Sequence, residues 1–420
     1  MCYNNLFAKW ESLLYYSHMF MTKIFTKLLI VLSFIVCYPC FSQPLDKQMV
    51  RVGIRPEEVF STLRLQSFSG NWRVEFAGAS ATRDLLTEGE DCTIMLVPKG
   101  MVARFSDGKE FGAGFSKITF SGGALLNLEI PDLQPVLLQN IIEVDFAENS
   151  MRLVNKITVH QHVVSSISKI GITNEPEALK ALCVMARSRL AWLIANTQHK
   201  DVPYDVCDEE HCVPFCGCGY NRELVDILAS MTADQIIRYG GKPILPRYQN
   251  TCGGHISSAK DIFGTDEPYH PAHPDLLDGK GSENCFHSPG FHWTIELQKV
   301  DFLDFLSIAF AGGADRIYTG WEPARVDSYG RIQQVTLRGR VPKILSGIDF
   351  HRALNEYFGP NGIKSMKFTM ELLRRTIIFR GMGQGEGVGL CIYGADGLAK
   401  KSQKYLEILK FYYPGTEVKQ

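Results

Sequence analysis

The sequence predicts an α+β protein, in which a β-rich segment is followed by a larger segment of mixed helices and antiparallel strands. Residues 49–148 consist of short runs of β-branched and aromatic residues separated by Gly, Asp, Ser and Pro, which is typical of a small antiparallel sheet or barrel. After residue 150, helical periodicity alternates with further strand-like runs. The length of 420 residues favours two domains, which we place at 49–148 and 150–420.

Residues 1–42 have the pattern of a leader with a signal peptide. Lys23 and Lys27 form a basic region, and the apolar run 28–36 that follows is too short to span a bilayer. Small residues then lead to Gln43. We therefore expect cleavage near Ser42-Gln43 and export to the periplasm or cell envelope.

The β-rich segment 49–148 shows no constellation of catalytic side chains, which favours a scaffold or an accessory binding domain. Asp107-Gly108 predicts a hairpin turn within it. The run LVNKITVHQHVV is expected to form a strand with His160 and His162 on one face, because side chains alternate along a strand. An exposed sheet face explains this pair better than a metal site, since no third ligand is close in sequence.

Residues 174–195 predict a buried helix that opens with a carboxylate, because apolar side chains recur on nearly every face. Asn174 is the expected N-cap, and Glu177 lies three residues later, at the spacing of a capping box. A carboxylate at the rim of such a helix loses solvent, so we expect a raised pKa for Glu177. A raised pKa suits a general acid, whereas a purely structural role in the capping box is the alternative.

The segment after this helix, DVCDEEHCVPFCGCGY, places Cys207, His211 and Cys212 close together, with Cys216 and Cys218 just behind. Thiolate and imidazole ligands suit zinc, and three protein ligands with an open fourth position are typical of a catalytic zinc site. In an exported protein the same cysteines could instead form disulfides. The spacing alone leaves both alternatives open.

Between residues 236 and 290 the sequence predicts a hairpin and a long loop. Gly240-Gly241 is the expected turn, and Pro243 and Pro246 favour an edge position for the second strand. Cys252 and Cys285 are candidates for a disulfide in an exported protein. The histidines of this region are weaker ligand candidates, because they are scattered through loops: His255, His270, His273 and His287.

The glycine-rich stretch 381–397 superficially resembles a phosphate loop, but no βαβ unit with a following acidic residue accompanies it, which excludes nucleotide binding. Glu386 lies in this stretch and would form a two-carboxylate site if it met Glu177. Residues 395–412 predict one final helix. The net charge of −1 gives no reason to expect nucleic acid as a partner.

Four blocks of sequence, in the same order, resemble the SpoIID/LytB family. EALKALCVMARSRL is similar to the helix signature of that family, and DVCDEEHC to its short Cys/His loop. YGGKPILPRYQNTCGG resembles its strand pair and CGG turn. GMGQGEGVGLCIYGADGLA followed by YLEILKFYYPGTEV resembles its closing block. The resemblance implies a SpoIID-like core in residues 150–420.

Members of this family are lytic transglycosylases that cut peptidoglycan glycan strands stripped of stem peptides, or enhancers of a cell-wall amidase. Carried across by position, the catalytic glutamate falls on Glu177, and the zinc loop on Cys207, His211 and Cys212. The resemblance therefore predicts an exported enzyme in which Glu177 protonates the glycosidic oxygen, and in which zinc shapes the cleft. Peptidoglycan glycan strands, and a cell-wall amidase, are the partners that it implies.

Other positions depart from the family pattern. Ile167 stands where a glutamate usually precedes the helix, Val213 and Ile392 replace glutamines, and Glu386 replaces a histidine. Loss of polar groups around a site weakens metal binding or activity by one to two orders of magnitude. The alternative function is therefore a non-catalytic peptidoglycan-binding protein that enhances an amidase. A third is a metal-free envelope protein held together by disulfides.

Overall fold

The computed structural model describes residues 43–77, 83–147, 149–196, 199–209, 211–220, 222–277, 281–310, 318–359 and 362–420. Residues 46–420 belong to one unit of the chain, called the larger unit below. The expected signal peptide, with Lys23, Lys27 and the apolar run 28–36, lies outside the described residues. None of the helices in the described ranges is both long and apolar enough to cross a lipid bilayer.

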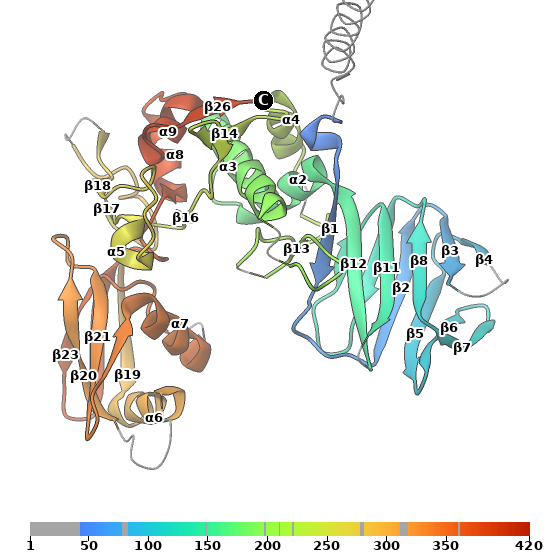
Figure 1. The fold of residues 1–420 in the computed structure, drawn as a ribbon, viewed down its shortest axis with the longest axis horizontal. Helices are drawn as coiled ribbons and strands as arrows, with labels where there is room; N and C mark the ends of the chain where they lie inside the picture. Colours follow the sequence, from blue (N-terminus) through green and yellow to red (C-terminus); the bar gives the residue numbers. More distant parts are fainter. Residues whose placement is uncertain are drawn as a thin grey trace, which may run out of the picture. The chain divides into compact units, whose positions relative to one another are not determined.

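The first part of the larger unit consists of two sheets (Figure 1). The strands of the first are β1 (Met49–Ile54), β3 (Trp72–Phe76), β4 (Arg83–Leu86), β8 (Lys117–Ser121), β11 (Ile141–Ala147), β12 (Ser150–Thr158) and β13 (Val206–Cys207). The strands of the second are β2 (Thr62–Ser69), β5 (Asp91–Val97), β6 (Gly100–Phe105), β7 (Glu110–Phe115), β9 (Leu125–Glu129) and β10 (Val136–Leu138). Their orders are β13-β1-β12-β11-β8-β3-β4 and β10-β9-β2-β5-β6-β7, and β13 alone of these pairs in parallel, with β1.

Aromatic side chains join the two sheets face to face. Phe76 at the end of β3 contacts Phe105, Phe111 and Phe115 of the second sheet, with ring centroids 6.5, 5.0 and 4.7 Å away. Burial alternates along β3, as expected for strands with one face in a core. The sequence prediction of a β-rich N-terminal segment, and of the α+β class, is therefore confirmed, and the turn at Asp107-Gly108 joins β6 to β7 as expected.

The strand β12 ends at Thr158, and helix α2 (Val159–Ile170) follows directly. The prediction that His160 and His162 lie on a strand is therefore wrong. Thr158 and Gln161 form a capping box that starts the helix at this point, and this signal outweighs the alternating pattern. His162 is fully buried, and His160 contacts Asp226 at 2.7 Å.

Helix α3 (Pro176–Ala195) is buried along most of its length, as predicted, and contacts α2, α4 (Glu223–Met231), α8 (Ile392–Lys400) and α9 (Tyr405–Tyr412). Its N-cap is Glu175 rather than the predicted Asn174, and no side chain caps it. Pro176 explains the difference, because proline at the first helical position fixes where the helix begins. Arg187, fully buried, donates to both carboxylate oxygens of Asp46 at 2.6 and 3.1 Å.

Of two further sequence predictions, a hairpin is confirmed and a single final helix is wrong. The hairpin turning at Gly240-Gly241 is present, with Pro243 on an edge strand. The predicted single helix 395–412 is instead two helices, α8 and α9, because the chain leaves helical geometry between Lys401 and Lys404 and Ser402 takes a positive φ of 65°. The short strands around them are β14 (Ile236–Tyr239), β15 (Lys242–Pro243), β16 (Tyr248–Gln249), β17 (His255–Ile256), β18 (His273–Pro274), β25 (Leu390–Cys391) and β26 (Glu417–Lys419).

Residues 292–382 form a separate apolar core around Phe305, Phe350 and Phe379. Two three-stranded sheets, in the orders β19-β24-β23 and β20-β21-β22, pack with helices on this core. These strands are β19 (His292–Gln298), β20 (Tyr318–Val326), β21 (Ile332–Gly339), β22 (Lys343–Ser346), β23 (Phe368–Leu372) and β24 (Thr376–Met382). The helices of this core are α6 (Lys299–Phe310) and α7 (Gly347–Phe358). Two short helices lie elsewhere: α5 (Ala259–Phe263) and the 3-10 helix η1 (Leu45–Lys47).

Candidate functional site

Glu177, in the first turn of α3, has both carboxylate oxygens engaged. Its Oε2 accepts a hydrogen bond from the backbone N–H of Tyr405 at 2.9 Å, and its Oε1 accepts one from Lys180 Nζ at 2.9 Å. Tyr405 is the first residue of α9, so Glu177 caps a helix other than its own. The side chain keeps 22% of its surface exposed.

These contacts shift the pKa of Glu177 in the direction opposite to the one expected from the sequence. Burial alone would raise the pKa of this carboxyl group, but the N–H of Tyr405 and the ammonium of Lys180 outweigh it, and the pKa lies below its usual value. The prediction of a raised pKa is therefore wrong, because the sequence could not show that two donors from α3 and α9 meet this carboxylate. Glu177 is an anion at neutral pH in this arrangement.

A hydrogen-bonded chain that the sequence analysis did not identify lies just before α3. Thr173 Oγ1 donates to Asp396 Oδ1 at 2.6 Å, and His287 Nε2 and Lys400 Nζ each contact Asp396 Oδ2 at 2.7 Å. Asp396 is buried, yet its pKa is lowered, because burial is outweighed by Lys400, Thr173 and His287. The only feature of the sequence that could have indicated this chain was the position of Asp396 within GADG. His287 was predicted only as a weak ligand candidate in a loop.

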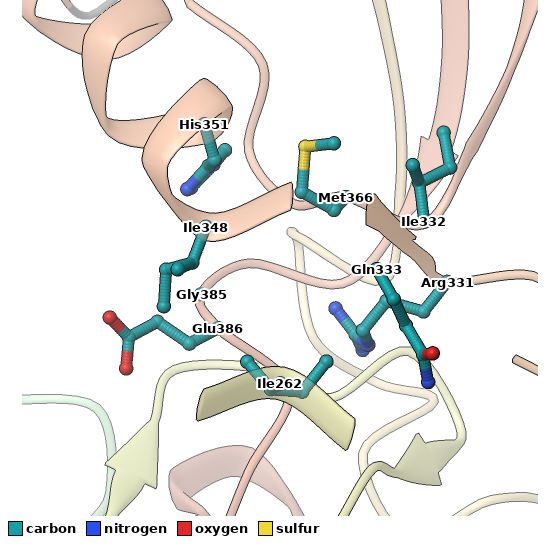
Figure 2. A pocket seen from close by; sticks show the side chains of 9 residues that line it. All are labelled: Ile262, Arg331, Ile332, Gln333, Ile348, His351, Met366, Gly385 and Glu386. Carbon is teal, nitrogen blue, oxygen red and sulfur yellow. The ribbon is translucent and has the colours of Figure 1, made fainter. Parts of the chain in front are cut away.

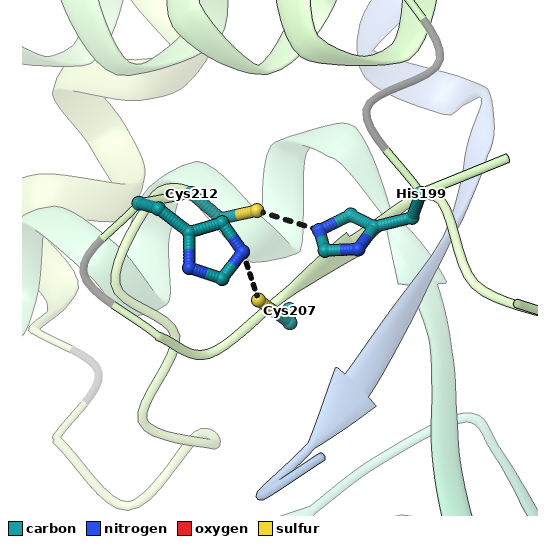
Figure 3. Close-up of side chains that lie close together, drawn as sticks. His199, Cys207 and Cys212 are labelled. Atoms are coloured by element: carbon teal, nitrogen blue, oxygen red, sulfur yellow. Dashed lines mark hydrogen bonds between the residues drawn. The ribbon is translucent and has the colours of Figure 1, made fainter. Parts of the chain in front are cut away.

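The cysteine and histidine cluster lies at the other end of α3, and the structure adds a fourth member to it. Ligand atoms of His199, Cys207, His211 and Cys212 all lie within 4.8 Å of one another. His199 Nε2 is 3.2 Å from Cys212 Sγ, and Cys207 Sγ is 3.2 Å from His211 Nε2 (Figure 3). We name these four residues cluster 1. His199, which precedes Cys207 by one short loop, was not among the ligands predicted from the sequence.

Two elements hold cluster 1 in place. Cys207 lies on β13 and pairs with Gly53 of β1. Gly53 is required there, because a Cβ atom would lie 2.9 Å from the ring of Tyr204. On the helix side, Arg189 of α3 donates to the carbonyl oxygens of Cys212 at 2.9 Å and His211 at 3.0 Å. The cluster therefore links the first sheet to the second half of α3.

The donor set of cluster 1 fits zinc, since two thiols and two imidazoles form a standard four-coordinate combination. A hydrogen bond between the two thiols lowers the pKa of Cys212 and raises that of Cys207, and His199 lowers the pKa of Cys212 further. Four protein donors are typical of a closed structural site, in contrast to the predicted three donors with an open position.

The structure does not pair the cysteines of this region. All of Cys207, Cys212, Cys216 and Cys218 are free thiols. Cys218 lies apart from cluster 1 and bonds Leu137 of β10 through its backbone N–H at 2.8 Å. Gly217 beside it has a φ of +70°, and a Cβ atom there would lie 2.2 Å from the carbonyl oxygen of Leu137.

Glu177 and cluster 1 do not share one cleft floor. Arg189 contacts the cluster, and it lies twelve residues after Glu177, which corresponds to about 18 Å along a helix axis. The interpretation of a carboxylate next to a metal loop, made from sequence proximity, is therefore not supported by the fold. The two groups must act separately.

Glu386 also lies apart from Glu177. It lines a small pocket with Arg331, His351 and Met366, and Figure 2 shows its carboxylate pointing away from the guanidinium of Arg331. The cavity volume is about 10 Å³, room for about one water molecule. Because Glu177 is not among the lining residues, this pocket does not form the two-carboxylate site considered above.

A larger cavity, of about 320 Å³, lies beside cluster 1. Its lining includes Arg55 after β1, Arg152 of β12 and Tyr204, whose ring is 4.9 Å from that of His199. Arg55 Nη1 is buried without a hydrogen-bond partner. The volume is that of a small-molecule or sugar subsite, and an unpaired guanidinium nitrogen favours an anionic or hydroxyl-bearing ligand.

Three of the positions that depart from the family pattern are apolar and buried. Ile167 lies in α2, Val213 follows cluster 1, and Ile392 begins α8. None of these side chains offers a donor or an acceptor. Buried apolar side chains therefore stand where the resemblance led us to expect polar groups around the helix and the zinc loop.

Comparison with known proteins gives a consistent result. Residues 147–239 match the sequence model of the family described as SpoIID, stage II sporulation protein. The chain is 24% identical to stage II sporulation protein D of Bacillus subtilis over 343 residues, which cover 78% of this chain and 92% of that protein. It is 27% identical over 271 residues to an uncharacterised protein of Brachyspira hyodysenteriae, covering 64% of this chain and 69% of that one.

A further relative is the amidase enhancer of Bacillus subtilis, at 22% identity over 283 residues. The match covers 57% of this chain and 37% of the enhancer. The chain thus spans about a third of the length of that relative.

Proposed function

Because the chain belongs to the SpoIID/LytB family, we propose that it acts at the bacterial cell wall, where it binds peptidoglycan glycan strands and stimulates a partner amidase. In this proposal Glu177 does not cut the strand. The observation that carries it is the double engagement of the Glu177 carboxylate by Tyr405 and Lys180.

Cleavage of a glycan strand requires a proton donor. Protonation of a glycosidic oxygen needs a carboxyl group that is neutral near pH 7, and glycosidases achieve this by raising its pKa. Glu177 has a lowered pKa, and position 167, where the family places another glutamate, holds isoleucine. Neither position supplies a proton donor.

The cavity of about 320 Å³ beside cluster 1 is the proposed glycan subsite. Strands stripped of stem peptides carry a free carboxylate on each muramic acid, and Arg55 and Arg152 supply the cations that would bind it. Zinc held by His199, Cys207, His211 and Cys212 would fix the loop that carries Tyr204. Its contribution is structural rigidity.

A second candidate function is that of a lytic transglycosylase in which Glu177 acts. It is favoured by the match of Glu177 to the catalytic glutamate of the family and by the exposure of 22% of its side chain. A bound strand that displaced Lys180 would raise the pKa of Glu177. Glu177 would then protonate the glycosidic oxygen, and the muramic acid 6-hydroxyl would attack its own anomeric carbon to leave a 1,6-anhydro end.

Mass spectrometry of amidase-stripped glycan strands, incubated with the mature protein, separates the two functions. We expect intact strands, sedimentation of the protein with them, and faster release of stem peptides when a cell-wall amidase is added to intact peptidoglycan. Anhydro-ended products from the wild type, but not from Glu177→Gln, would overturn this and establish the second candidate. Glu175→Gln is the matched control, because Glu175 lies two residues before Glu177 and its side chain makes no capping hydrogen bond.

Binding at the proposed subsite has its own test. Arg55→Gln should reduce sedimentation with stripped strands about tenfold, since it removes a charge-assisted hydrogen bond. Arg104→Gln, which changes an arginine on β6 that pairs with Glu110, should leave sedimentation unchanged. Equal binding by both variants would exclude this cavity as the glycan site.

A further inference from the structure

A second group of metal-ligating side chains lies in the other half of the larger unit, away from the groups used above. Cys252, Asp275, Cys285 and Cys391 place their ligand atoms within 4.8 Å of one another. All four side chains are completely buried. Cys252 lies in the CGG turn, Asp275 directly follows β18, Cys285 lies ten residues further on, and Cys391 stands at the start of α8, so up to 139 residues of sequence separate them. We name these four residues cluster 2.

The distances within cluster 2 are slightly shorter than those between neighbouring ligands of one tetrahedral ion, so small shifts of these side chains would admit the ion. Cys252 Sγ lies 3.4 Å from Cys285 Sγ and 3.1 Å from Asp275 Oδ2. For zinc, with bonds of about 2.3 Å to sulfur and about 2.0 Å to oxygen, tetrahedral geometry separates neighbouring ligand atoms by about 3.5 to 3.8 Å. Cys252 and Cys285, predicted from sequence as a disulfide pair, are both free thiols in the structure.

Hydrogen bonds already orient two of the four side chains of cluster 2, Asp275 and Cys391. Asp275 Oδ1 accepts hydrogen bonds from Tyr412 Oη at 2.8 Å and Asn284 Nδ2 at 3.1 Å, which leaves Oδ2 directed at the sulfur of Cys252. Cys391 Sγ accepts from the backbone N–H groups of Cys252 and Gly394, both at 3.3 Å. Hydrogen bonds of this kind to carboxylate and thiolate ligands are a regular feature of metal sites.

The burial of cluster 2 means that its four side chains can be ionised together only beside a cation. Anionic side chains without water or a counter-charge are strongly unfavourable in a protein interior. Two cationic side chains bond the backbone beside cluster 2: Arg331 Nη2 donates to the carbonyl oxygen of Cys252 at 3.1 Å, and Lys367 Nζ to that of Gly253 at 2.8 Å. A divalent ion at the centre of the four ligand atoms would offset two of the four negative charges that three thiolates and one carboxylate carry as ligands.

We propose that Cys252, Asp275, Cys285 and Cys391 bind a second, structural zinc ion. Three thiolates select a soft or borderline ion, and four protein ligands close the coordination sphere. The ion would fasten α8 to the CGG turn and to the long loop. Two glycines allow this close packing, since a Cβ atom at Gly394 would lie 2.1 Å from Tyr412 Oη, and one at Gly397 2.0 Å from the carbonyl oxygen of Asn284.

The consequence reaches the start of α3. Helix α8 carries Asp396, which bonds Thr173 and His287. Zinc at cluster 2 would therefore fix the position of the Asp396 carboxylate next to the first turn of α3. This role is independent of whether the protein binds or cuts glycan strands.

Metal analysis of the purified full-length protein tests the proposal. The chain, exported from cells and kept in reducing buffer, should contain two zinc ions. Cys391→Ser and Cys212→Ser should each contain one, and the double variant none. Cys183→Ala, which changes a buried cysteine outside both clusters, should contain two. A wild-type content of one ion that disappears in Cys212→Ser would overturn the proposal.

Two further measurements keep the test decisive if Cys391→Ser fails to fold. Cobalt added to metal-free Cys212→Ser should give a strong thiolate charge-transfer band, because only cluster 2 remains and it offers three thiolates. Mass spectrometry after alkylation without reduction should find Cys252 and Cys285 alkylated when metal has been removed. A peptide pair linked by a Cys252–Cys285 disulfide, with no charge-transfer band, would show that this is a disulfide site.

Discussion

The two ends of helix α3 are fixed by similar chemistry built in different ways. At the C-terminal end, Arg189 bonds the carbonyl oxygens of His211 and Cys212, so α3 is tied to cluster 1. At the N-terminal end, Thr173 bonds Asp396 of α8, whose first turn begins at Cys391 of cluster 2. Cluster 1 comes from fourteen consecutive positions, 199–212, whereas cluster 2 is assembled from 252 to 391.

Cluster 1 is therefore built from one local segment, whereas cluster 2 depends on contacts between distant segments. A metal held by neighbouring residues stabilises one loop, which then packs against the rest of the fold. A metal held by three distant segments can bind only after those segments have docked, so its binding energy contributes to the tertiary fold itself. We expect the loss of cluster 1 to act on one side of α3, and the loss of cluster 2 to act on the packing of α8.

Loss of the metal from cluster 1 should give the largest effect. Cys212→Ser removes a buried ligand, so the free energy of unfolding should fall by more than about 4 kcal/mol in the zinc-bound protein. Thermal unfolding with zinc analysis of the same samples measures both quantities. Cys183→Ala removes a sulfur of equal burial but no ligand, and should cost about 1 kcal/mol. Equal losses in the two variants would mean that cluster 1 holds no stabilising ion.

Removal of a hydrogen bond behind cluster 2 should give the next largest effect. Tyr412→Phe deletes the donor to Asp275 Oδ1, so zinc affinity at cluster 2 should fall about 10- to 100-fold. Competition with a chelator measures this affinity. Tyr413→Phe is a matched control, because Tyr413 is also buried but donates to the carbonyl oxygen of Arg247. An unchanged affinity in Tyr412→Phe would argue against Asp275 as a ligand.

The features that could be predicted from the sequence are those formed by residues close together in the chain, as the two clusters illustrate. Periodicity indicated the buried helix α3, and ligand spacing indicated three of the four members of cluster 1. His199 was missed because it stands outside the compact spacing. Of cluster 2, the sequence indicated only Cys252 and Cys285, which were predicted as a disulfide. Nothing in the sequence shows that Asp275 or Cys391 lies beside them.

The pKa of Glu177 shows the same limit for a single residue. Its burial could be predicted from the apolar helix around it, and burial raises the pKa of a carboxyl group. The sign of the final shift depends on the N–H of Tyr405, which lies 228 positions further along the chain. The prediction of a strand at His160 and His162 was wrong for a local reason. A capping box at the start of α2 outweighed the alternating pattern that suggested a strand.

A smaller effect is expected when the charge of Glu177 is removed. Glu177→Gln should lower the free energy of unfolding by about 1 to 2 kcal/mol at pH 7, because a charge-assisted bond to Lys180 is lost and the bond to the N–H of Tyr405 is weakened. The folded-state pKa lies below the usual 4.5, so this stability is present above about pH 4.5 and is lost as the pH falls through the folded value.

Denaturant unfolding of the wild type and Glu177→Gln, measured from pH 7 to pH 3, tests this sign. The difference between them should shrink toward the acidic end. Glu175→Gln, at the adjacent N-cap, should differ from the wild type by less than about 0.5 kcal/mol at pH 7. A Glu177→Gln variant that gains relative stability as the pH rises would mean that the carboxyl group has a raised pKa, as an acid catalyst requires.

The smallest expected effect tests whether the two clusters are independent. Arg189→Lys keeps the charge but cannot make both carbonyl contacts in the same geometry, so it should cost about 0.5 to 1 kcal/mol. Because those carbonyl oxygens belong to His211 and Cys212, a chelator should remove zinc from cluster 1 several-fold faster in this variant. Release from cluster 2 in the same sample is the internal control, and it should keep its wild-type rate. Acceleration at both clusters would show that α3 couples them, and that the two ends of the helix form one cooperative unit.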